Sequence, residues 1–238
     1  MKVMGVVPAR YASSRFPGKP LAVIAGKTMI EHVYRRASEA KSLQELWVAT
    51  DDERIFAAVE AFGGNVVMTR PDHPTGTDRI AEAASGLDAE VIVNIQGDEP
   101  LLDPGEIDAV VEPFTTEPDV VMSTAATPIK DPRDVQDPGV VKVVLDRRGF
   151  ALYFSRLPIP YYRAASDGRW LKHLGLYAYR RDFLFTYAAL PPTPLEAAER
   201  LEQLRALEHG HRIRVVLTDH DAVSVDTPQD LERVRALF

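Results

Sequence analysis

The sequence predicts an α/β protein built around a mostly parallel β-sheet. Short runs rich in β-branched residues alternate with stretches whose apolar residues recur at helical spacing. This alternation is typical of βαβ units. The strand segments are almost continuously apolar, which indicates a sheet that helices cover on both faces.

The first half of the chain carries the clearest alternation. We expect strands at residues 2–8, 45–50, 65–69, 90–95 and 119–125, and helices at 28–41, 52–62, 77–86 and 105–116. Thr28-Met29-Ile30-Glu31 has the spacing of a capping box, so a helix should begin there.

The second half is less regular. The expected elements are a hairpin of strands 139–145 and 150–156, an irregular stretch 157–172, a strand 173–180, a helix 194–209, a strand 212–218 and a helix 228–237. Pro194 suits the first turn of its helix and Gly210 the C-cap. We expect one domain over 1–238, with about 139–180 forming an insertion.

Composition excludes several classes of function. The net charge of −7 argues against a broad nucleic-acid or anionic-membrane surface, although it leaves room for a local basic pocket. With no cysteine, the chain can form neither a disulfide framework nor a thiolate zinc site. No apolar run approaches the roughly 18 residues that span a bilayer, and the N-terminus lacks a signal-peptide pattern, so we expect a cytoplasmic protein.

Positive charge gathers in the segment that follows the first strand. Pro8-Ala9-Arg10 leads into Arg15, Gly18 and Lys19. In an open parallel sheet, ligands bind beyond the carboxyl ends of the strands. Several cations on a loop shaped by glycine and proline suit a polyphosphate, because charge-assisted hydrogen bonds must converge on it. A solvated charged loop explains the same composition equally well.

Two acidic segments also follow predicted strands. Gln96-Gly97-Asp98-Glu99-Pro100 comes after the fourth strand, and Asp226 precedes Thr227-Pro228 near the C-terminus. Carboxylates at such positions suit Mg²⁺, which prefers one or two carboxylates together with substrate phosphates. Each also has a simpler interpretation, since Thr227 is a good N-cap and Asp226 favours the helix dipole.

Other motifs are absent or incomplete. Gly26-Lys27-Thr28 resembles the end of a P-loop, but Leu21 stands where that motif requires glycine. No Gly-x-Gly-x-x-Gly follows a strand, which argues against a dinucleotide dehydrogenase. The six histidines show no metal-ligand spacing.

Segments along the whole chain resemble the family of 3-deoxy-manno-octulosonate cytidylyltransferases, also called CMP-Kdo synthetases. They are PARYASSRFPGKPL, ATDD, RPDHPTGTDR, NIQGDEP, YFSRLPIPY, HLGLYAYR, LEQLRALEHG and VDTPQDL. CMP-sialate synthetases and other nucleotide-sugar enzymes share the N-terminal loop. The segments YFSRLPIP and EQLRALE narrow the resemblance to the enzymes that act on Kdo. Thr75 stands where the family usually has serine, and we expect tighter packing near the cytosine as the consequence.

The resemblance implies a three-layer Rossmann-like nucleotidyltransferase fold with a mostly parallel mixed sheet. It also implies the reaction CTP + Kdo → CMP-Kdo + diphosphate, for lipopolysaccharide biosynthesis, with Mg²⁺ as cofactor. The catalytic residues carried over from the family are Lys19, Asp98 and Asp226, the last two as metal ligands. The CTP-binding residues carried over are Arg10, Arg15, Lys19, Thr75, Arg79 and Gln96.

For Kdo, the family pattern points to Arg156, His173, Tyr177, Glu202 and Gln203. A 2-keto acid needs a cation for its carboxylate and polar partners for its hydroxyls. By helical spacing alone, Glu202 and Gln203 fall outside the apolar stripe of the predicted helix and would be a solvated face. The resemblance overrides that interpretation.

The family is homodimeric, and its partners are small molecules rather than nucleic acid or membrane. We expect the dimer interface at the hairpin and at 157–172, because Phe150, Tyr153 and Phe154 would otherwise form an exposed apolar patch.

Three alternatives remain open from the sequence. The sugar could be another acidic one, such as sialic acid or an amino-substituted Kdo. The chain could be a catalytically idle nucleotide-binding or regulatory protein. A glycosyltransferase is a third possibility, although Gln96-Gly97-Asp98 does not match its usual Asp-x-Asp motif.

Overall fold

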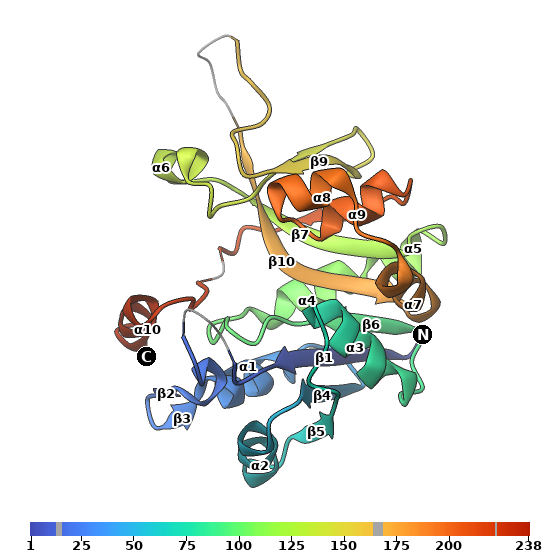
Figure 1. Cartoon of the computed structure of the whole chain (residues 1–238). Helices are drawn as coiled ribbons and strands as arrows, with labels where there is room; N and C mark the ends of the chain where they lie inside the picture. The colour runs from blue at the N-terminus through green and yellow to red at the C-terminus, as the bar shows by residue number, and fades with distance from the viewer. Residues whose placement is uncertain (13–15, 164–168, 222) are drawn as a thin grey trace. The chain divides into compact units, whose positions relative to one another are not determined.

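The chain packs as two units in the computed structural model, which describes residues 1–12, 16–163, 169–221 and 223–238. Met1–Asp108 and Ala222–Phe238 form the first unit, and Ala109–Asp221 form the second. Figure 1 traces the order of the elements along the chain. Because the C-terminal segment returns to the unit of the N-terminus, residues far apart in sequence can meet there.

The first unit is built on four parallel strands in the order β6-β1-β4-β5. Their bounds are Val3–Ala9 for β1, Glu45–Thr50 for β4, Asn65–Met68 for β5 and Val91–Asn94 for β6. The corresponding sequence predictions are confirmed to within one residue at each end. The side chains of β6 are buried throughout, and those of β1 nearly so.

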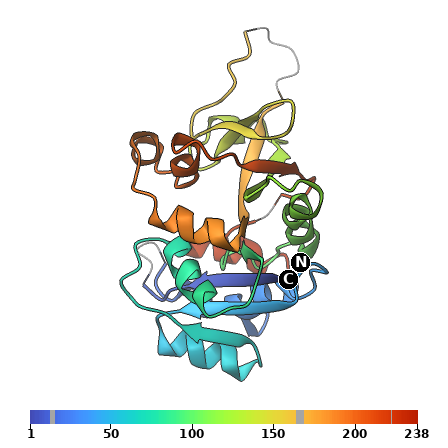
Figure 2. The ribbon, with the colours of Figure 1, turned by 90° about the vertical axis from the view of Figure 1, so that its right-hand side faces the viewer.

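Helices connect these strands on both faces of the sheet. Their bounds are Met29–Ala37 for α1, Glu53–Ala61 for α2 and Gly76–Ser85 for α3. Right-handed crossovers place α1 and α2 on one face, because β1, β4 and β5 succeed one another in a single direction. The connection through α3 runs back past β1 to β6, so α3 covers the opposite face. Figure 2 shows α2, in cyan, beside β5.

This reversal of direction locates the site of the first unit. The strand order changes sense between β1 and β6, and the connections after these two strands diverge to opposite faces. An open α/β sheet has its natural crevice at that switch point, beyond the carboxyl ends of the two strands. The segments after Ala9 and Asn94 both begin there.

Two predicted helix starts are confirmed. The Thr28 hydroxyl caps α1 by accepting a hydrogen bond from the backbone N–H of Glu31 at 3.3 Å. Thr227 caps α10 (Pro228–Arg235), and its backbone N–H donates in return to the Asp230 carboxylate at 2.9 Å. Each cap satisfies N–H groups that a helix leaves without a partner in its first turn.

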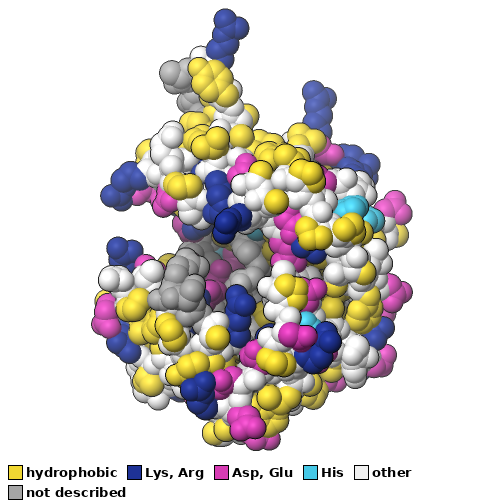
Figure 3. All heavy atoms as spheres, viewed as in Figure 1, with side chains coloured by type: hydrophobic (Ala, Val, Ile, Leu, Met, Phe, Trp, Pro, Cys, Tyr) yellow, Lys and Arg dark blue, Asp and Glu magenta, His cyan; other side chains and the backbone are white. Residues whose placement is uncertain are grey.

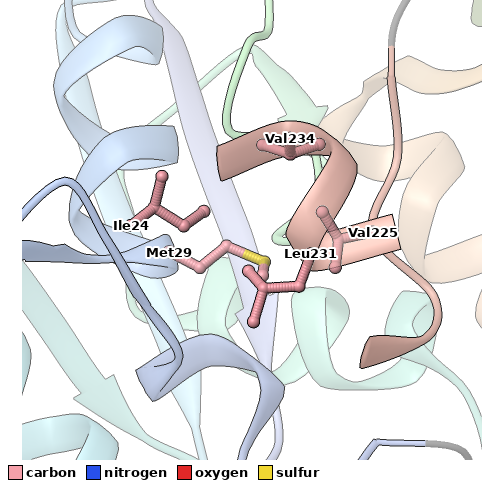
Figure 4. Packing of buried hydrophobic residues seen from close by; sticks show 5 residues of the cluster. All are labelled: Ile24, Met29, Val225, Leu231 and Val234. Atoms are coloured by element: carbon pink, nitrogen blue, oxygen red, sulfur yellow. The ribbon is translucent and has the colours of Figure 1, made fainter. Parts of the chain in front are cut away.

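An apolar cluster attaches α10 to the N-terminal part of the first unit. Figure 4 shows Leu231 and Val234 of α10 beside Ile24 and Met29, with Val225 from the segment before the helix. Ile24 belongs to β2 (Val23–Ile24), which pairs with β3 (Lys27–Thr28). All five side chains are at least 95% buried. Their burial holds the C-terminal segment in place mainly through the hydrophobic effect.

The second unit contains a mixed set of strands. Their bounds are Met122–Pro128 for β7, Lys142–Leu145 for β8, Ala151–Ser155 for β9, Leu171–Arg180 for β10 and Arg214–Leu217 for β11. β7 pairs with β11 in parallel and with β10 antiparallel, and β8 pairs antiparallel with β10 and β9. The predicted hairpin is confirmed as β8 and β9. Gly149 has a φ of 79° in its turn, a conformation that favours glycine.

The predicted helix over 194–209 is wrong, because it is interrupted. α8 (Pro194–Glu199) ends at Arg200, which adopts the left-handed conformation with φ 52°, and α9 (Gln203–Glu208) begins three residues later. The break turns Arg205 back toward α8, where its guanidinium donates to both carboxylate oxygens of Glu196, at 2.8 and 2.5 Å. A continuous helix would separate these two residues by more than two turns.

Other element predictions need smaller corrections. The predicted helix over 105–116 is two helices, α4 (Pro104–Val111) and α5 (Pro113–Thr116), because Pro113 has no N–H for a continuous ladder. β7 lies later in the chain than the predicted strand 119–125. The remaining helices, not predicted, are α6 (Pro132–Gln136) and α7 (Arg181–Ala189).

The expectation of an exposed apolar patch at Phe150, Tyr153 and Phe154 is wrong for the two phenylalanines, and Tyr153 is half-buried. Phe150 and Phe154 are buried within the second unit. The Phe154 ring packs edge-on against His173, with centroids 5.0 Å apart, and the Arg212 guanidinium lies 3.6 Å from the centroid of Phe150. Exposed apolar side chains of the hairpin and the segment after it include Leu152 of β9, Leu157 and Tyr161.

Among the helices that the structure describes, none is long and apolar enough to cross a bilayer. Residues 139–180 lie inside the second unit. Their role as an insertion for sugar and dimer contacts stays a prediction.

Candidate active site

A pocket of about 300 Å³ lies at the switch point of the first unit, beyond β1 and β6. Its walls include these sequence-predicted residues: Arg10, Lys19, Thr75, Arg79, Gln96, Asp98 and Asp226. Arg15, the remaining predicted CTP contact, falls outside the described residues. The structure therefore brings together the described members of the predicted nucleotide and metal set.

A lysine lies between the two predicted metal ligands. The Lys19 ammonium donates a hydrogen bond to Asp98 Oδ2 at 2.6 Å, and its Nζ is 3.5 Å from Asp226 Oδ1. The side chains of Lys19, Asp98 and Asp226 are 16%, 23% and 40% exposed, so a ligand in the pocket can reach all three. The ammonium compensates two carboxylates that would otherwise repel each other.

Asp226 reaches this position through the backbone of its neighbour. The N–H of Val225 donates to the carbonyl oxygen of Asp98 at 2.9 Å. Val225 is fully buried in the apolar cluster of Figure 4. The backbone bond and the cluster together align the C-terminal segment beside the end of β6, so the two aspartates meet although 128 positions separate their numbers in the sequence.

Lys19 is the first residue of a short 3₁₀ turn, η1 (Lys19–Leu21). Gly18, directly before it, donates its N–H to the carbonyl of Tyr11 at 2.9 Å and has a φ of 73°. A Cβ at Gly18 would lie 3.1 Å from the Tyr11 ring, so glycine is needed for both conformation and space. The Arg54 guanidinium covers that ring, 3.3 Å from its centroid.

Sequence reasoning did not identify the structural role of Gly97. A Cβ on Gly97 would approach the Pro8 carbonyl oxygen to 3.2 Å and the Val7 side chain to 3.3 Å. Glycine thus allows the turn after β6 to pass close to the end of β1. The signal was present, since a glycine directly after a buried strand often marks a close backbone approach.

Arg79 and Thr75 are held by hydrogen bonds within the pocket wall. Arg79 is buried and donates to Asp51 Oδ2 at 3.0 Å and to the Thr69 hydroxyl. The Thr75 hydroxyl caps α3, donating to Asp78 at 2.7 Å while accepting from the Asp78 N–H. These contacts give both residues a structural role in shaping the wall. Their contacts with the base stay predictions.

His73 is a pocket residue that sequence reasoning did not select. Its ring Nε2 contacts the Glu82 carboxylate, and Glu82 also accepts from the backbone N–H of Arg70 at 3.2 Å. Burial raises the pKa of Glu82, but these hydrogen bonds outweigh it and lower the pKa below its usual value. Glu82 is therefore a carboxylate that orients the His73 ring in the pocket wall.

The positive charge of this site is local. Figure 3 shows Lys and Arg side chains mixed with Asp and Glu over the face in view, which fits the net charge of −7. Within the described parts of the chain, no group of three or more His, Cys, Asp or Glu residues is arranged to hold a metal ion. Two carboxylates in the pocket match a cation that takes its other ligands from a substrate and water.

The residues predicted for the sugar lie in the second unit. His173 and Tyr177 are both on β10, with ring centroids 5.4 Å apart. His173 Nε2 lies 3.0 Å from the Thr124 hydroxyl, and burial lowers the pKa of His173 to about 3. Burial also raises the pKa of Tyr177, helped by the nearby Tyr179 and by the negative charge of Glu202. At neutral pH both rings are therefore uncharged.

Arg156 lies against the break between α8 and α9. Its guanidinium donates to three backbone carbonyls, those of Glu199 at 2.7 Å, Pro138 at 2.8 Å and Arg200 at 3.3 Å. A guanidinium has five N–H donors, so these bonds leave donors for a ligand. Arg156 is thus fixed in orientation beside the start of α9.

Gln203 and Glu202 do not form the solvated face that helical spacing predicts. Gln203 is 94% buried and Glu202 is half-buried. The Tyr187 hydroxyl donates to the Glu202 carbonyl at 2.7 Å, which holds the first turn of α9 against α7. The break at Arg200 shifts the phase of the helix, so a pattern read over 194–209 as one helix assigns these two residues to the wrong side.

Comparisons with known proteins identify the family. The family model described as Cytidylyltransferase matches residues 4–213. The 3-deoxy-manno-octulosonate cytidylyltransferase of Solibacter usitatus is 60% identical over 238 residues, covering 100% of this chain and 94% of that protein. The protein of the same name from Syntrophotalea carbinolica is 56% identical, over 99% of this chain and 98% of that protein.

Solved structures agree with the sequence comparisons. A CMP:2-keto-3-deoxy-manno-octonic acid synthetase complexed with CTP is 47% identical and superposes with a TM-score of 0.96, over 100% of this chain and 98% of that chain. A cytidylyltransferase from Leptospira borgpetersenii, 18% identical with a TM-score of 0.67 over 100% of this chain and 88% of that one, shows the shared fold alone. The α/β nucleotidyltransferase fold and the resemblance noted in the sequence are thereby confirmed, and the chain belongs to the family of 3-deoxy-manno-octulosonate cytidylyltransferases.

Proposed function

We propose that this chain transfers CMP from CTP to 3-deoxy-manno-octulosonate (Kdo), producing CMP-Kdo and diphosphate. The observation that carries the proposal is the Lys19 ammonium between the Asp98 and Asp226 carboxylates, in a pocket at the switch point of a parallel sheet. A nucleoside triphosphate needs such a combination of a cation and metal-binding oxygens. The names of the relatives support CTP and Kdo as substrates.

The reaction forms one bond and breaks one. The anomeric hydroxyl oxygen of Kdo bonds to the α-phosphorus of CTP, while the bond from that phosphorus to the bridging oxygen of the β-phosphate breaks. Diphosphate leaves with the electron pair, and the hydroxyl proton is released. Phosphoryl chemistry of this kind depends on positioning and charge compensation. Lys19 and the exposed Arg10 supply positive charge for the triphosphate, and Arg15 is assigned to the same task.

We assign the cofactor role to Mg²⁺, held by Asp98 and Asp226 together with substrate phosphates. The donor set fits, because both carboxylates line the pocket and are partly exposed. Bound there, Mg²⁺ would polarise phosphate oxygens and lower the pKa of the sugar hydroxyl. Their shared contact with Lys19 holds the Asp98 and Asp226 carboxylates near each other. Thr75, Arg79 and Gln96 complete the nucleotide wall, with base recognition assigned to this group.

For the sugar, Arg156 is the cation that pairs with the carboxylate. His173 is unsuited to that task, because burial keeps its imidazole neutral above a pH of about 3. His173, Tyr177, Glu202 and Gln203 offer neutral and anionic polar groups that suit hydroxyls. The division of roles follows from charge.

We further propose that the chain forms a homodimer through the region after β8. Leu152, Leu157 and Tyr161 are 62%, 70% and 87% exposed, and apolar side chains of this size are typical of an interface. Sedimentation velocity at micromolar concentration should give the mass of two chains, and Leu157→Lys should shift the equilibrium toward the monomer. A monomeric wild-type protein would contradict the assignment.

The decisive experiment measures diphosphate release with CTP and Kdo in the presence of Mg²⁺, beside UTP and beside sialic acid. We expect the wild type to prefer CTP and Kdo, and Asp98→Asn to lose at least about 10³-fold in kcat, because charge compensation at the phosphate fails. Asp88→Asn is the matched control, since Asp88 is 99% exposed and outside the pocket. Near-normal turnover by Asp98→Asn, with an unchanged melting temperature in both variants, would refute the metal assignment.

Lys19→Met tests the cation of the pocket. We expect KM for CTP to rise about tenfold and kcat to fall, because a charge-assisted contact to the triphosphate is lost. The control is Lys27→Met, which removes an exposed lysine of β3. If steady-state kinetics with CTP as the varied substrate are the same for wild type and Lys19→Met, Lys19 does not bind the nucleotide.

The pKa of His173 predicts a pH-dependent stability. The folded pKa is about 3 and the usual value is 6.5, so between these limits only the unfolded chain takes up the proton. The free energy of unfolding should therefore fall as the pH drops below 6.5, with a contribution of up to about 1.4 kcal/mol per pH unit. Denaturant unfolding at several pH values should show this slope reduced in His173→Gln and retained in the control His209→Gln, which replaces an exposed histidine. Equal slopes in the two variants would contradict the buried neutral imidazole.

A further inference from the structure

A lysine is buried in the second unit at a place that the proposed reaction does not use. Lys142, the first residue of β8, is fully buried. Its Nζ donates to three backbone carbonyl oxygens, those of Asp137 at 2.9 Å, Val140 at 2.6 Å and Arg156 at 2.6 Å. Three acceptors match the three N–H donors of an ammonium group, so the arrangement is that of a charged lysine with every donor satisfied.

Burying this charge is unfavourable without those bonds. Desolvation lowers the pKa of Lys142, the nearby Asp137 raises it, and the guanidinium of Arg156 lowers it further. An apolar residue at a strand position of this kind would avoid the desolvation penalty. The question is therefore what the three carbonyl contacts hold in place.

The carbonyls belong to two segments that also hold Arg156. Asp137 and Val140 bound a tight turn, in which the Val140 N–H donates to the Asp137 carbonyl at 3.1 Å. The Arg156 guanidinium binds the carbonyl of Pro138 in the same turn, at 2.8 Å. The Lys142 ammonium also binds carbonyls of this turn, those of Asp137 and Val140, together with the main-chain carbonyl of Arg156 itself. One ammonium thus connects the backbone of Arg156 with the surface against which its side chain rests.

We propose that Lys142 is a positioning residue for recognition of the acidic sugar. By joining the 137–140 turn to the end of β9, it fixes the orientation of the Arg156 guanidinium and so the direction of the N–H donors that remain for a carboxylate. The proposal rests on the proposed function, in which Arg156 pairs with the carboxylate of Kdo. It assigns to Lys142 no contact with either substrate.

A purely structural role of Lys142 predicts different experimental results. If Lys142 only stabilised the second unit, its loss would lower the melting temperature and affect both substrates alike. If it orients Arg156, its loss acts on the binding of the sugar and depends on Arg156 being present. The binding of the two substrates and the coupling between the two residues therefore separate the alternatives.

The experiment compares Lys142→Met and Lys142→Gln with the wild type in steady-state kinetics, varying each substrate in turn. We expect KM for Kdo to rise about tenfold, because a misdirected guanidinium weakens the ion pair, with kcat and the KM for CTP within about twofold of the wild type. Lys142→Gln keeps a polar head with two N–H donors and carries the test if the methionine variant does not fold. Lys130→Met is the matched control, since Lys130 is exposed and its Nζ donates to the carbonyl of Asp219.

A double-mutant cycle supplies the second readout. In an Arg156→Gln background, which already lacks the guanidinium, Lys142→Met should change KM for Kdo by less than about twofold. Full additivity of the two substitutions, or an unchanged KM for Kdo in both lysine variants while Arg156→Gln raises it, would overturn the positioning role. If Arg156→Gln itself leaves KM for Kdo unchanged, the carboxylate role of Arg156 is wrong, which is a failure of the proposed function.

Discussion

The contact of one ammonium group with two carboxylates organises the first unit. Lys19 lies 2.6 Å from Asp98 and 3.5 Å from Asp226, at the mouth of the sheet. Each residue comes from a different segment, and none has a short-range reason to approach the others. Opposite charges at these distances attract one another even with partial exposure to water. Other contacts within this unit bring the three segments to one point.

Three packing arrangements achieve this. The reversal of strand order opens a crevice between β1 and β6, and Gly97 lets the turn after β6 pass beside the Pro8 carbonyl. The Gly18 N–H binds the Tyr11 carbonyl directly before Lys19. The buried Val225 donates its N–H to the Asp98 carbonyl, and its side chain belongs to the same apolar cluster as Leu231 and Val234 of α10. Backbone bonds and apolar contacts thus position the charges, which is why the site can keep them partly exposed.

The second unit follows a different electrostatic rule. Its candidate sugar residues include two half-buried aromatic groups that stay uncharged at neutral pH, His173 and Tyr177. The positive charge is concentrated in Arg156, whose guanidinium is oriented by backbone carbonyls, and in Lys142 behind it. An ion pair with a carboxylate is strongest where the cation is already oriented, because less conformational entropy is lost on binding. Under the proposed function, the charge of Arg156 would select the acid, while the neutral and anionic polar groups would suit the sugar hydroxyls.

The sequence by itself determined the parallel strands, the caps at Thr28 and Thr227, and the family, because these depend on local composition and on ordered motifs. Local patterns could not show that Asp98 and Asp226 meet. The family resemblance implied it, and the return of the C-terminal segment to the first unit brings them to one pocket. Helical spacing also could not predict the burial of Gln203, because the left-handed Arg200 changes the helical phase of the residues that follow. Such outcomes depend on contacts between residues remote in the chain, whose energies no local pattern contains.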